Sequence, residues 1–257
     1  MSKIFNFIEM EKGLFVEETY LTLLSRHNFV HHLTDWENLE KFFTLTFSHK
    51  KGYREVKAFQ IEGQEIYVKK YLRNLKEGKE EWKNISLLWE KGIPTSVPIF
   101  YFQKSSFILI GTKKIEGKPF IYYLEENSKL VPFLIKKIAE FMATFHIKGF
   151  IHQDCYLNHF YWDEIGEKLY LIDVGRVKYK SPLFFYYRLK DLSQLKFSFY
   201  KYFGKNGPSA WCEFLNHYEK NLPKPLNNLE KIIIHWKFIK IKKHTEKLEK
   251  FKLIDTL

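Results

Sequence analysis

The sequence predicts an α+β protein of two lobes, a small antiparallel β-sheet lobe with one main helix and a larger, mostly helical lobe. Up to residue 111 the apolar pattern is mostly that of strands, and beyond it the pattern is mostly helical. This change predicts a boundary between residues 1–111 and residues 112–257. A chain of 257 residues with 18% aromatic residues can bury a substantial core, so disorder is not expected.

The first half of the chain carries the strand signals. Residues 1–50 have the weakest pattern, which predicts short strands near residues 5–16 and a short helix capped near Thr34 and running to Phe43. Residues 52–72 predict two antiparallel strands joined by a turn at residues 62–64. Two further strands are expected over residues 97–101 and 106–110, which would complete the sheet lobe.

A lysine and a glutamate in this region form the first candidate pair. Lys69 lies within an apolar strand, so it either points to water or reaches a buried anion. Glu81 opens a helical pattern with apolar residues every three or four positions, ended by Gly92 and Pro94. Kinase folds hold a strand lysine for the ATP phosphates with a glutamate on the next helix. Taken alone, Glu81 is equally one acid on a charged helix face.

Two acidic residues in turn-like settings form the second candidate pair. Asp154 and Asp173 are separated by 173 − 154 = 19 residues, and the intervening residues 160–172 predict a short β-hairpin. The hairpin brings the two flanking loops to one edge. One carboxylate can then orient a nucleophile while the other holds a metal, which is the protein-kinase catalytic arrangement.

The second half of the chain carries the helix signals. Residues 130–148 and 186–202 predict helices, and Asp191 in the second of them either accepts hydrogen bonds from the catalytic loop or faces solvent. Residues 229–251 are basic and aromatic. We interpret them as a final helix that packs an apolar stripe on the lobe, in preference to a helix on a membrane surface.

The composition limits the compartment and the partners. Lys and Arg exceed Asp and Glu by 42 − 30 = 12, which fits nucleic acid, an anionic membrane, a polyanionic substrate or simply a soluble lysine-rich surface. No nucleic-acid-binding module is recognised, so no nucleic acid is expected. Two cysteines favour a reducing cytoplasm, and we expect neither a signal peptide nor a membrane span.

Six short motifs in order resemble the lipopolysaccharide kinases, a bacterial branch of the protein-kinase-like fold, and most closely the core heptose(I) kinases. They are the F-R-E-like run at residues 53–55, Tyr67-Val68-Lys69, Glu81-Trp82, the H-R-D-C-Y-x-x-H-F-like run at residues 152–160, the I-D-x-x-R-like run at residues 172–176, and Lys190-Asp191-Leu192. The resemblance covers roughly residues 51–202.

The resemblance implies a bilobal protein-kinase-like fold and an ATP- and Mg²⁺-dependent kinase that phosphorylates a heptose of the lipopolysaccharide core. It implies that Asp154 is catalytic, that Lys69, Glu81 and Arg54 bind ATP, and that Asp173 and His159 hold the metal. Supporting roles fall to three residues: Asp191, Arg176 and His152. The lipid A-linked core substrate would place the protein in the cytoplasm, peripheral to the inner face of the inner membrane.

The sequence departs from the usual kinase pattern at three places. Gln153 replaces the usual arginine, His159 stands where most kinases have a metal-binding asparagine, and residues 51–54 replace a glycine-rich loop. Two alternatives therefore stay open. One is a kinase of another sugar, such as 3-deoxy-D-manno-octulosonic acid, or an antibiotic phosphotransferase. The other is a pseudokinase that binds nucleotide without turnover.

Overall fold

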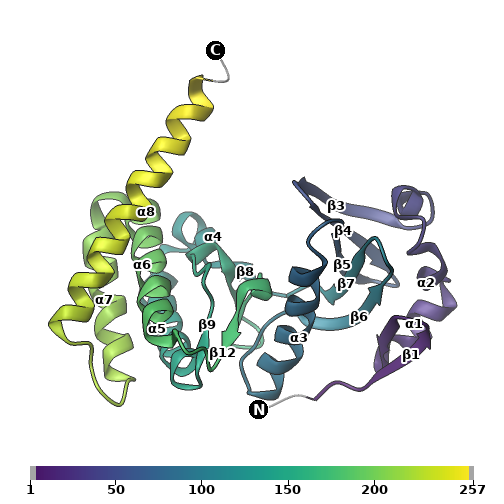
Figure 1. Cartoon of the computed structure of the whole chain (residues 1–257), viewed down its shortest axis with the longest axis horizontal. Helices are drawn as coiled ribbons and strands as arrows, with labels where there is room; N and C mark the ends of the chain where they lie inside the picture. Colours follow the sequence, from purple (N-terminus) through teal and green to yellow (C-terminus); the bar gives the residue numbers. More distant parts are fainter. Residues whose placement is uncertain (1–3, 255–257) are drawn as a thin grey trace. The chain divides into compact units, whose positions relative to one another are not determined.

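A seven-stranded antiparallel sheet organises the N-terminal part of the protein, with strand order β1-β2-β6-β7-β5-β4-β3 (Figure 1). The structure is a computed structural model that describes residues 4–254, with side chains described up to residue 247. The strands are β1 (Phe7–Glu11), β2 (Leu14–Glu17), β3 (Thr44–Lys51), β4 (Arg54–Ile61), β5 (Gln64–Tyr71), β6 (Val97–Gln103) and β7 (Ile108–Lys113). The four strands expected between residues 52 and 110 are confirmed, and β3 is an additional strand that the sequence pattern did not reveal.

The weakly patterned N-terminal segment is part of the core of this sheet. Its helices are α1 (Leu21–Arg26), α2 (Phe29–His32) and a 3₁₀ helix over Trp36–Lys41. Phe29 is fully buried, and its ring lies 6.0 Å from those of Phe59 on β4 and Phe100 on β6. The helix predicted to run to Phe43 is the 3₁₀ helix. It ends two residues earlier, and its N-cap residue, Asp35, makes no side-chain capping bond.

Helix α3 (Leu75–Glu90) begins six residues before Glu81, where the apolar pattern had placed its start. Its first turns read Leu-Lys-Glu-Gly-Lys-Glu and offer almost no apolar periodicity, which concealed them. The Asn74 side chain caps the helix by accepting a hydrogen bond from the Glu77 N–H. Gly78 lies against the Tyr71 ring, where an added Cβ would meet Tyr71 Cδ2 at 3.0 Å.

The second part of the chain contains five α-helices and two small sheets among the residues that the structure describes. The helices are α4 (Phe120–Glu126), α5 (Val131–Ile147), α6 (Phe184–Phe203), α7 (Gly207–Lys220) and α8 (Asn228–Ile254). The strands are β8 (Lys118–Pro119), β9 (Phe150–Ile151), β10 (Phe160–Asp163), β11 (Lys168–Leu171) and β12 (Lys178–Tyr179), in sheets ordered β11-β10-β8 and β12-β9. The helices expected near residues 130–148 and 186–202 and the β10–β11 hairpin are confirmed, as is the α+β class.

The contacts within the chain define two compact units. One runs to Glu116 and includes Asp173–Gly175, and the other comprises Gly117–Ile172 and the chain from Arg176 onward. The predicted lobe boundary after residue 111 stays a prediction. Among the described residues, the helices are all too short or too polar to cross a membrane.

Helix α8 confirms only part of what its sequence suggested. Ile234 and Phe238 are buried, and the Phe238 ring lies 4.7 Å from that of Tyr200 on α6, as expected for a helix packed on its domain. Other apolar residues of α8 remain exposed, which the packing interpretation did not predict.

Candidate active site

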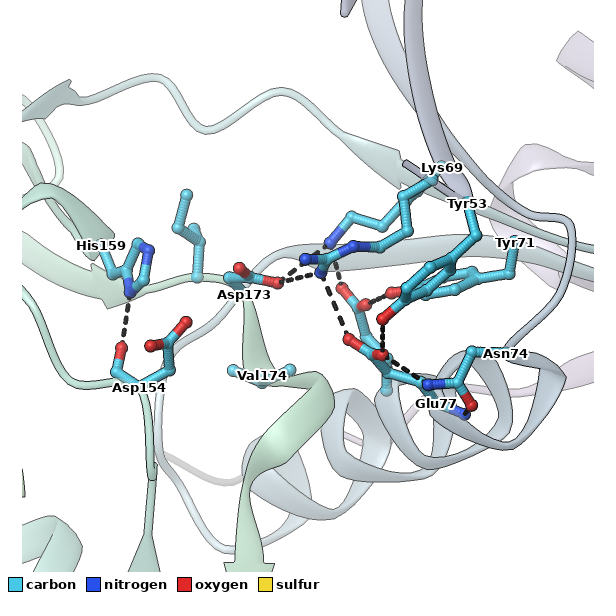
Figure 2. Close-up of polar contacts among 12 residues, drawn as sticks. Tyr53, Lys69, Tyr71, Asn74, Glu77, Asp154, His159, Asp173 and Val174 are labelled. Carbon is cyan, nitrogen blue, oxygen red and sulfur yellow. Dashed lines mark hydrogen bonds and ion pairs between the residues drawn. The ribbon is translucent and has the colours of Figure 1, made fainter. Parts of the chain in front are cut away.

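Lys69 is the centre of a charged cluster on one face of β5. Side chains alternate along a strand, so Lys69 and Tyr71 point toward α3, whereas Lys70 lies on the opposite face with its Nζ 5.2 Å from the Trp36 ring. Lys69 Nζ donates to Glu81 Oε1 at 2.7 Å and lies 3.4 Å from Asp173 Oδ1 (Figure 2). The sequence left open whether Lys69 points to water or to an anion, and the structure shows that it binds two carboxylates.

Burial and charge act in opposite directions on this cluster. Burial disfavours the charged form of Lys69, but the attraction of Glu81 and Asp173 outweighs it and raises the pKa of Lys69 above its usual range. Glu81 is 5% exposed, and burial raises its pKa although Lys69 partly opposes this. The Tyr71 hydroxyl donates to the second oxygen of Glu81. Lys69 is therefore a fixed, permanently protonated cation at neutral pH.

Arg54 brings a second cation to Asp173 and pairs with a further acid, Glu77. It is the first residue of β4, directly after the β3–β4 turn, in which Gly52 adopts a φ of +61°. Arg54 Nη1 lies 3.3 Å from Glu77 Oε1 and 3.6 Å from Asp173 Oδ1. The Tyr53 hydroxyl also donates to Glu77, whose side chain thereby ties this hairpin to α3 (Figure 2).

The segment that carries Asp173 is anchored on α3. Asn84 Nδ2 donates to the Val174 carbonyl oxygen at 2.9 Å, and both groups are buried. Asp173 itself adopts a φ of +57°, a left-handed conformation that is uncommon outside glycine and costs energy unless the surroundings fix it. The contacts of Asp173 with Lys69 and Arg54 and the bond to Val174 supply that fixation.

In the second unit, helix α6 holds the loop that carries Asp154 through hydrogen bonds to the loop backbone. Asp191 is fully buried and accepts hydrogen bonds from the N–H groups of His152 and Gln153, both at 2.7 Å. This decides between the two interpretations of Asp191, because its carboxylate binds the loop and does not face solvent. Gln153 adopts a φ of +65°, so the loop turns sharply at the residue whose N–H donates to Asp191.

Further along α6, two more polar side chains continue the same contact. Gln194 Oε1 accepts from the Cys155 N–H at 3.0 Å, and its Nε2 donates to the Gln153 carbonyl at 3.2 Å. Ser198 Oγ accepts from the Leu157 N–H at 3.3 Å. Burial raises the pKa of the Cys155 thiol well above its usual range, so this thiol stays protonated and is no nucleophile.

The two histidines of the loop have defined tautomers in their neutral forms. His152 Nδ1 accepts from the Asp154 N–H at 3.3 Å, so its Nε2 carries the proton and donates to the Ile172 carbonyl at 3.2 Å. His159 Nδ1 lies 2.9 Å from the Asp154 carbonyl oxygen and must donate to it, which leaves the lone pair on Nε2 (Figure 2). The Ile172 N–H also donates to the His159 carbonyl, which ties the residue preceding Asp173 to this loop.

The two remaining predicted residues, Asp154 and Arg176, lie at partly or fully exposed positions. The Asp154 side chain is half-buried, in a loop whose backbone is held on both sides. Arg176 is exposed, and its carbonyl accepts from Gln153 Nε2 at 3.2 Å. Lys69, Glu81, Arg54 and Asp173 are brought together within the first unit, whereas the convergence of Asp154 and His159 with them stays a prediction.

A lysine held by a helix glutamate, an acid after a short hairpin and a buried acid beneath a histidine-containing loop together define a protein-kinase-like phosphotransferase fold. The chain belongs to the lipopolysaccharide kinase (Kdo/WaaP) family, whose sequence pattern it matches over residues 50–218. A search of the curated proteins finds no significant match.

Two solved structures show the same fold. The structure of WaaP in complex with acyl carrier protein has a TM-score of 0.64 and 20% sequence identity, covering 90% of this chain and 98% of that one. The structure of an aminoglycoside-3'-phosphotransferase of type VIII has a TM-score of 0.61 and 14% identity, covering 79% of this chain and 97% of that one. The predicted family and the kinase-like fold are both confirmed.

Several residues of the site were not identified from the sequence pattern. Glu77 lies one helical turn before Glu81 on α3, and Gln194 and Ser198 lie one and two turns after Asp191 on α6. Residues three, four or seven positions apart lie on the same face of a helix. Once α3 and α6 are known, these spacings show that Glu77 lies beside Glu81, and that Gln194 and Ser198 lie beside Asp191. Tyr71 is two positions after Lys69, and residues two positions apart on a strand point to the same face of the sheet.

Proposed function

We propose that the protein is an ATP-dependent kinase that transfers the γ-phosphoryl group of ATP to a hydroxyl of a heptose in the lipopolysaccharide inner core. The observation that carries this proposal is the 2.7 Å contact between Lys69 Nζ and Glu81 Oε1, with Asp173 Oδ1 at 3.4 Å from the same nitrogen. A half-buried lysine held between two acids can exchange one of them for an anionic ligand, and a triphosphate is the anion that kinases of this fold bind.

In this proposal each residue of the cluster has one task. Lys69 contacts the α- and β-phosphates, and Glu81 fixes its position. Arg54 contributes a second positive charge toward the phosphates from the β3–β4 turn. The carboxylate of Asp173 is an oxygen donor of the kind that Mg²⁺ prefers, and the imidazole of His159 would be a second ligand. The cation would supply charge neutralisation for the phosphates.

The catalytic loop then supplies the acceptor side of the reaction. Asp154 accepts the proton of the attacking sugar hydroxyl or orients that hydroxyl toward the γ-phosphorus. His152 and Asp191 hold the loop backbone, so they act on Asp154 through its position. The exposed guanidinium of Arg176 follows Asp173 by three residues and stabilises phosphate charge. Positioning and charge neutralisation of this kind account for most of the catalysis in phosphoryl transfer.

The heptose acceptor rests on the motif pairs Cys155-Tyr156 and His159-Phe160, which resemble those of the heptose branch of the family. The lipid A-linked core is anionic, so the formal net charge of +12 favours its approach. We further propose that the protein works in the cytoplasm at the inner face of the inner membrane, where such an acceptor is presented. Nucleic acid is not expected as a partner.

The substitution Asp154→Asn tests the proposed roles. We expect transfer to the acceptor to fall by at least about 10³-fold, because the variant cannot take the hydroxyl proton, while ATP affinity changes less than about threefold. A radiolabel transfer assay and nucleotide binding measure the two quantities. The matched control is Asp163→Asn, an acid of the β10–β11 turn that binds backbone N–H groups at 2.9 and 3.1 Å. Full transfer by Asp154→Asn would refute the assignment.

The acceptor is tested separately with purified core oligosaccharides. We expect mass spectrometry to show one added phosphate on a core that contains heptose, and none on a core that ends at 3-deoxy-D-manno-octulosonic acid. The opposite result would assign the protein to the other branch of the family. Nucleotide binding without phosphate addition to either core would support the pseudokinase alternative.

A further inference from the structure

Helix α8 carries a row of exposed apolar side chains. Leu229 is 64% exposed, Ile232 53%, Trp236 66% and Ile239 37%. Their spacings of three, four and three residues place them on one side of the helix. These four residues are called the α8 stripe. A large exposed tryptophan between isoleucines is an unusual surface for a folded domain and marks an interaction site.

The α8 stripe lies away from the side of the helix that packs on the domain. Ile234 and Phe238 are buried at 2% and 5% exposure, and both follow stripe residues by two positions, a rotation of about 200° around a helix. Glu230, also on the packed side, is paired with Arg188 of α6. One apolar side of the helix therefore packs on the domain, and a second apolar side is exposed.

Lysines outnumber acidic residues on the helix that carries the stripe. Between Leu229 and Lys247 the helix has six lysines and two glutamates: Lys231, Lys237, Lys240, Lys242, Lys243, Lys247, Glu230 and Glu246. Of the two acids, Glu230 is buried and Glu246 lies 3.8 Å from Lys242. Lys240 and Lys243 each follow a stripe residue by four positions, so both lie on the stripe side of the helix.

The start of α6 continues this surface beside α8. Tyr186 is 54% exposed, and Lys237 Nζ lies 3.4 Å from the centroid of its ring, in the geometry of a cation–π contact. Phe185, next to it, is 52% exposed. Aromatic rings and lysines thus alternate on two neighbouring helices of the same unit.

We propose that the α8 stripe, with Lys240 and Lys243, is a docking surface for an anionic lipid bilayer. A helix that lies in the bilayer interface buries an apolar side below the headgroups and keeps basic residues among the anionic ones. A tryptophan suits the headgroup depth because its ring is both apolar and polar. A second copy of the chain is a poorer occupant, since it would bring two lysine-rich sides together.

The geometry leaves the surface accessible. Figure 1 shows the C-terminal part of α8 extending beyond the ends of α6 and α7, and the exposures of 37–66% show that the stripe itself is not covered. The docking surface complements the lipid-linked acceptor proposed above, because it would hold the kinase where that acceptor is anchored. It does not depend on that proposal, because the experiment below uses neither nucleotide nor acceptor.

Flotation of the purified full chain with vesicles tests the docking surface. We expect binding to vesicles containing 30% phosphatidylglycerol in phosphatidylcholine, and weak binding to phosphatidylcholine alone. The double substitution Ile232→Ser/Trp236→Ser should reduce binding to anionic vesicles at least tenfold. The matched control is Ile165→Ser, which alters a 98% exposed isoleucine at the tip of the β10–β11 hairpin and should leave binding unchanged.

Charge and insertion are separated by two further variants. Lys240→Glu/Lys243→Glu should weaken binding to anionic vesicles at least tenfold, since each basic residue near such a surface contributes roughly fivefold. The control Lys129→Glu, an exposed lysine next to α5, should have little effect. Brominated lipids should quench tryptophan fluorescence in the wild type but not in Trp236→Phe, because Trp236 is the exposed one among the six tryptophans.

Four results would overturn the proposal. The first is equal vesicle binding by the wild type and the Ile232→Ser/Trp236→Ser variant, and the second is no binding of the wild type to either vesicle. The third is a dimer that dissociates in the Trp236→Ser variant, which would assign the stripe to a second copy. Vesicle-independent binding to purified acyl carrier protein that is lost in Trp236→Ser would likewise assign it to a protein partner.

Discussion

Lys69 shows how one side chain depends on its neighbours for its chemistry. A lysine at this depth would lose its proton more easily if it were alone, because burial disfavours the charged form. Glu81 and Asp173 reverse that tendency, and the phosphates of ATP would extend the same attraction. Lys69 thus keeps its positive charge in a half-buried position, where a charge is screened less than at the surface.

The substitution Lys69→Met is expected to lower kcat for transfer by about 10²–10³-fold, the usual effect of removing one electrostatic stabiliser. The single change also leaves Glu81 buried without its cation, which destabilises the fold. The double variant Lys69→Met/Glu81→Gln removes both charges and should recover stability while activity stays lost. Urea unfolding and steady-state kinetics separate the two effects. Activity restored together with stability would show that Lys69 has only a structural role.

The same pair has a defined pH dependence. Because the pKa of Lys69 is raised above its usual value of 10.5, its stabilising effect is fully present below that value and is lost as pH rises through the folded-state pKa. The difference in free energy of unfolding between the wild type and Lys69→Met/Glu81→Gln should therefore be constant from pH 7 to about 9.5. A steady decline across that interval would contradict the assigned charge state.

At the scale of elements, side chains of α6 hold the backbone of the loop that carries Asp154. Asp191, Gln194 and Ser198 bind loop backbone groups at 2.7, 3.0 and 3.3 Å, on one face of one helix. His146 of α5 adds a contact to Asp191 at 3.4 Å, and burial lowers the pKa of His146, so it supports the carboxylate as a neutral ring. The backbone of the loop that carries Asp154 is thus held by side chains of α6.

The substitution Asp191→Ala should lower the free energy of unfolding by about 3 kcal/mol, because the N–H groups of the buried His152 and the half-buried Gln153 lose their acceptor. Ser198→Ala should cost about 1 kcal/mol, since it removes one longer bond. Urea denaturation measures both, with the exposed Lys201→Ala on the same helix as control. The order Asp191, then Ser198, then Lys201 is the essential outcome, and equal losses would refute the support role of the helix.

How far the sequence predicts these elements depends on where their stabilising contacts lie. The β10–β11 hairpin and α5 were predictable because their apolar residues alternate or recur within a few positions. The first turns of α3 were not, because they are held by a cap at Asn74 and by Gly78 against Tyr71, neither of which gives a periodic signal. Strand β3 was missed because its residues are mostly exposed, so its pairing with β4 supplies the order that its sequence lacks.

The candidate site divides in the same way. The residues proposed to bind nucleotide and metal, among them Lys69 and Asp173, were found because short motifs preserve their order along the chain. Their supports, such as Glu77 and Gln194, are defined by helix faces and could be named only when those faces were known. The direction of Asp191 was undecidable from its helix pattern, since a buried acid and a solvated acid occupy the same position in a sequence.

For the whole molecule, the chain has 42 basic and 30 acidic residues, and this excess of positive charge would attract the anionic acceptor proposed above. Salt shortens the range of that attraction, from about 14 Å at 50 mM to about 6 Å at 300 mM ionic strength. The chemical step occurs between groups in contact and is screened far less. We therefore expect kcat/KM for the lipid-linked acceptor to fall at least fivefold between these salt concentrations, while kcat changes less than twofold.

A neutral sugar acceptor provides the control for this salt dependence. It has no long-range attraction to a basic surface, so its kcat/KM should respond to salt only through the nucleotide, which both reactions share. Steady-state kinetics with the two acceptors at a fixed, saturating ATP concentration isolate the contribution of the acceptor charge. Equal salt dependence for both acceptors would mean that the excess positive charge serves solubility and plays no part in recruiting the substrate.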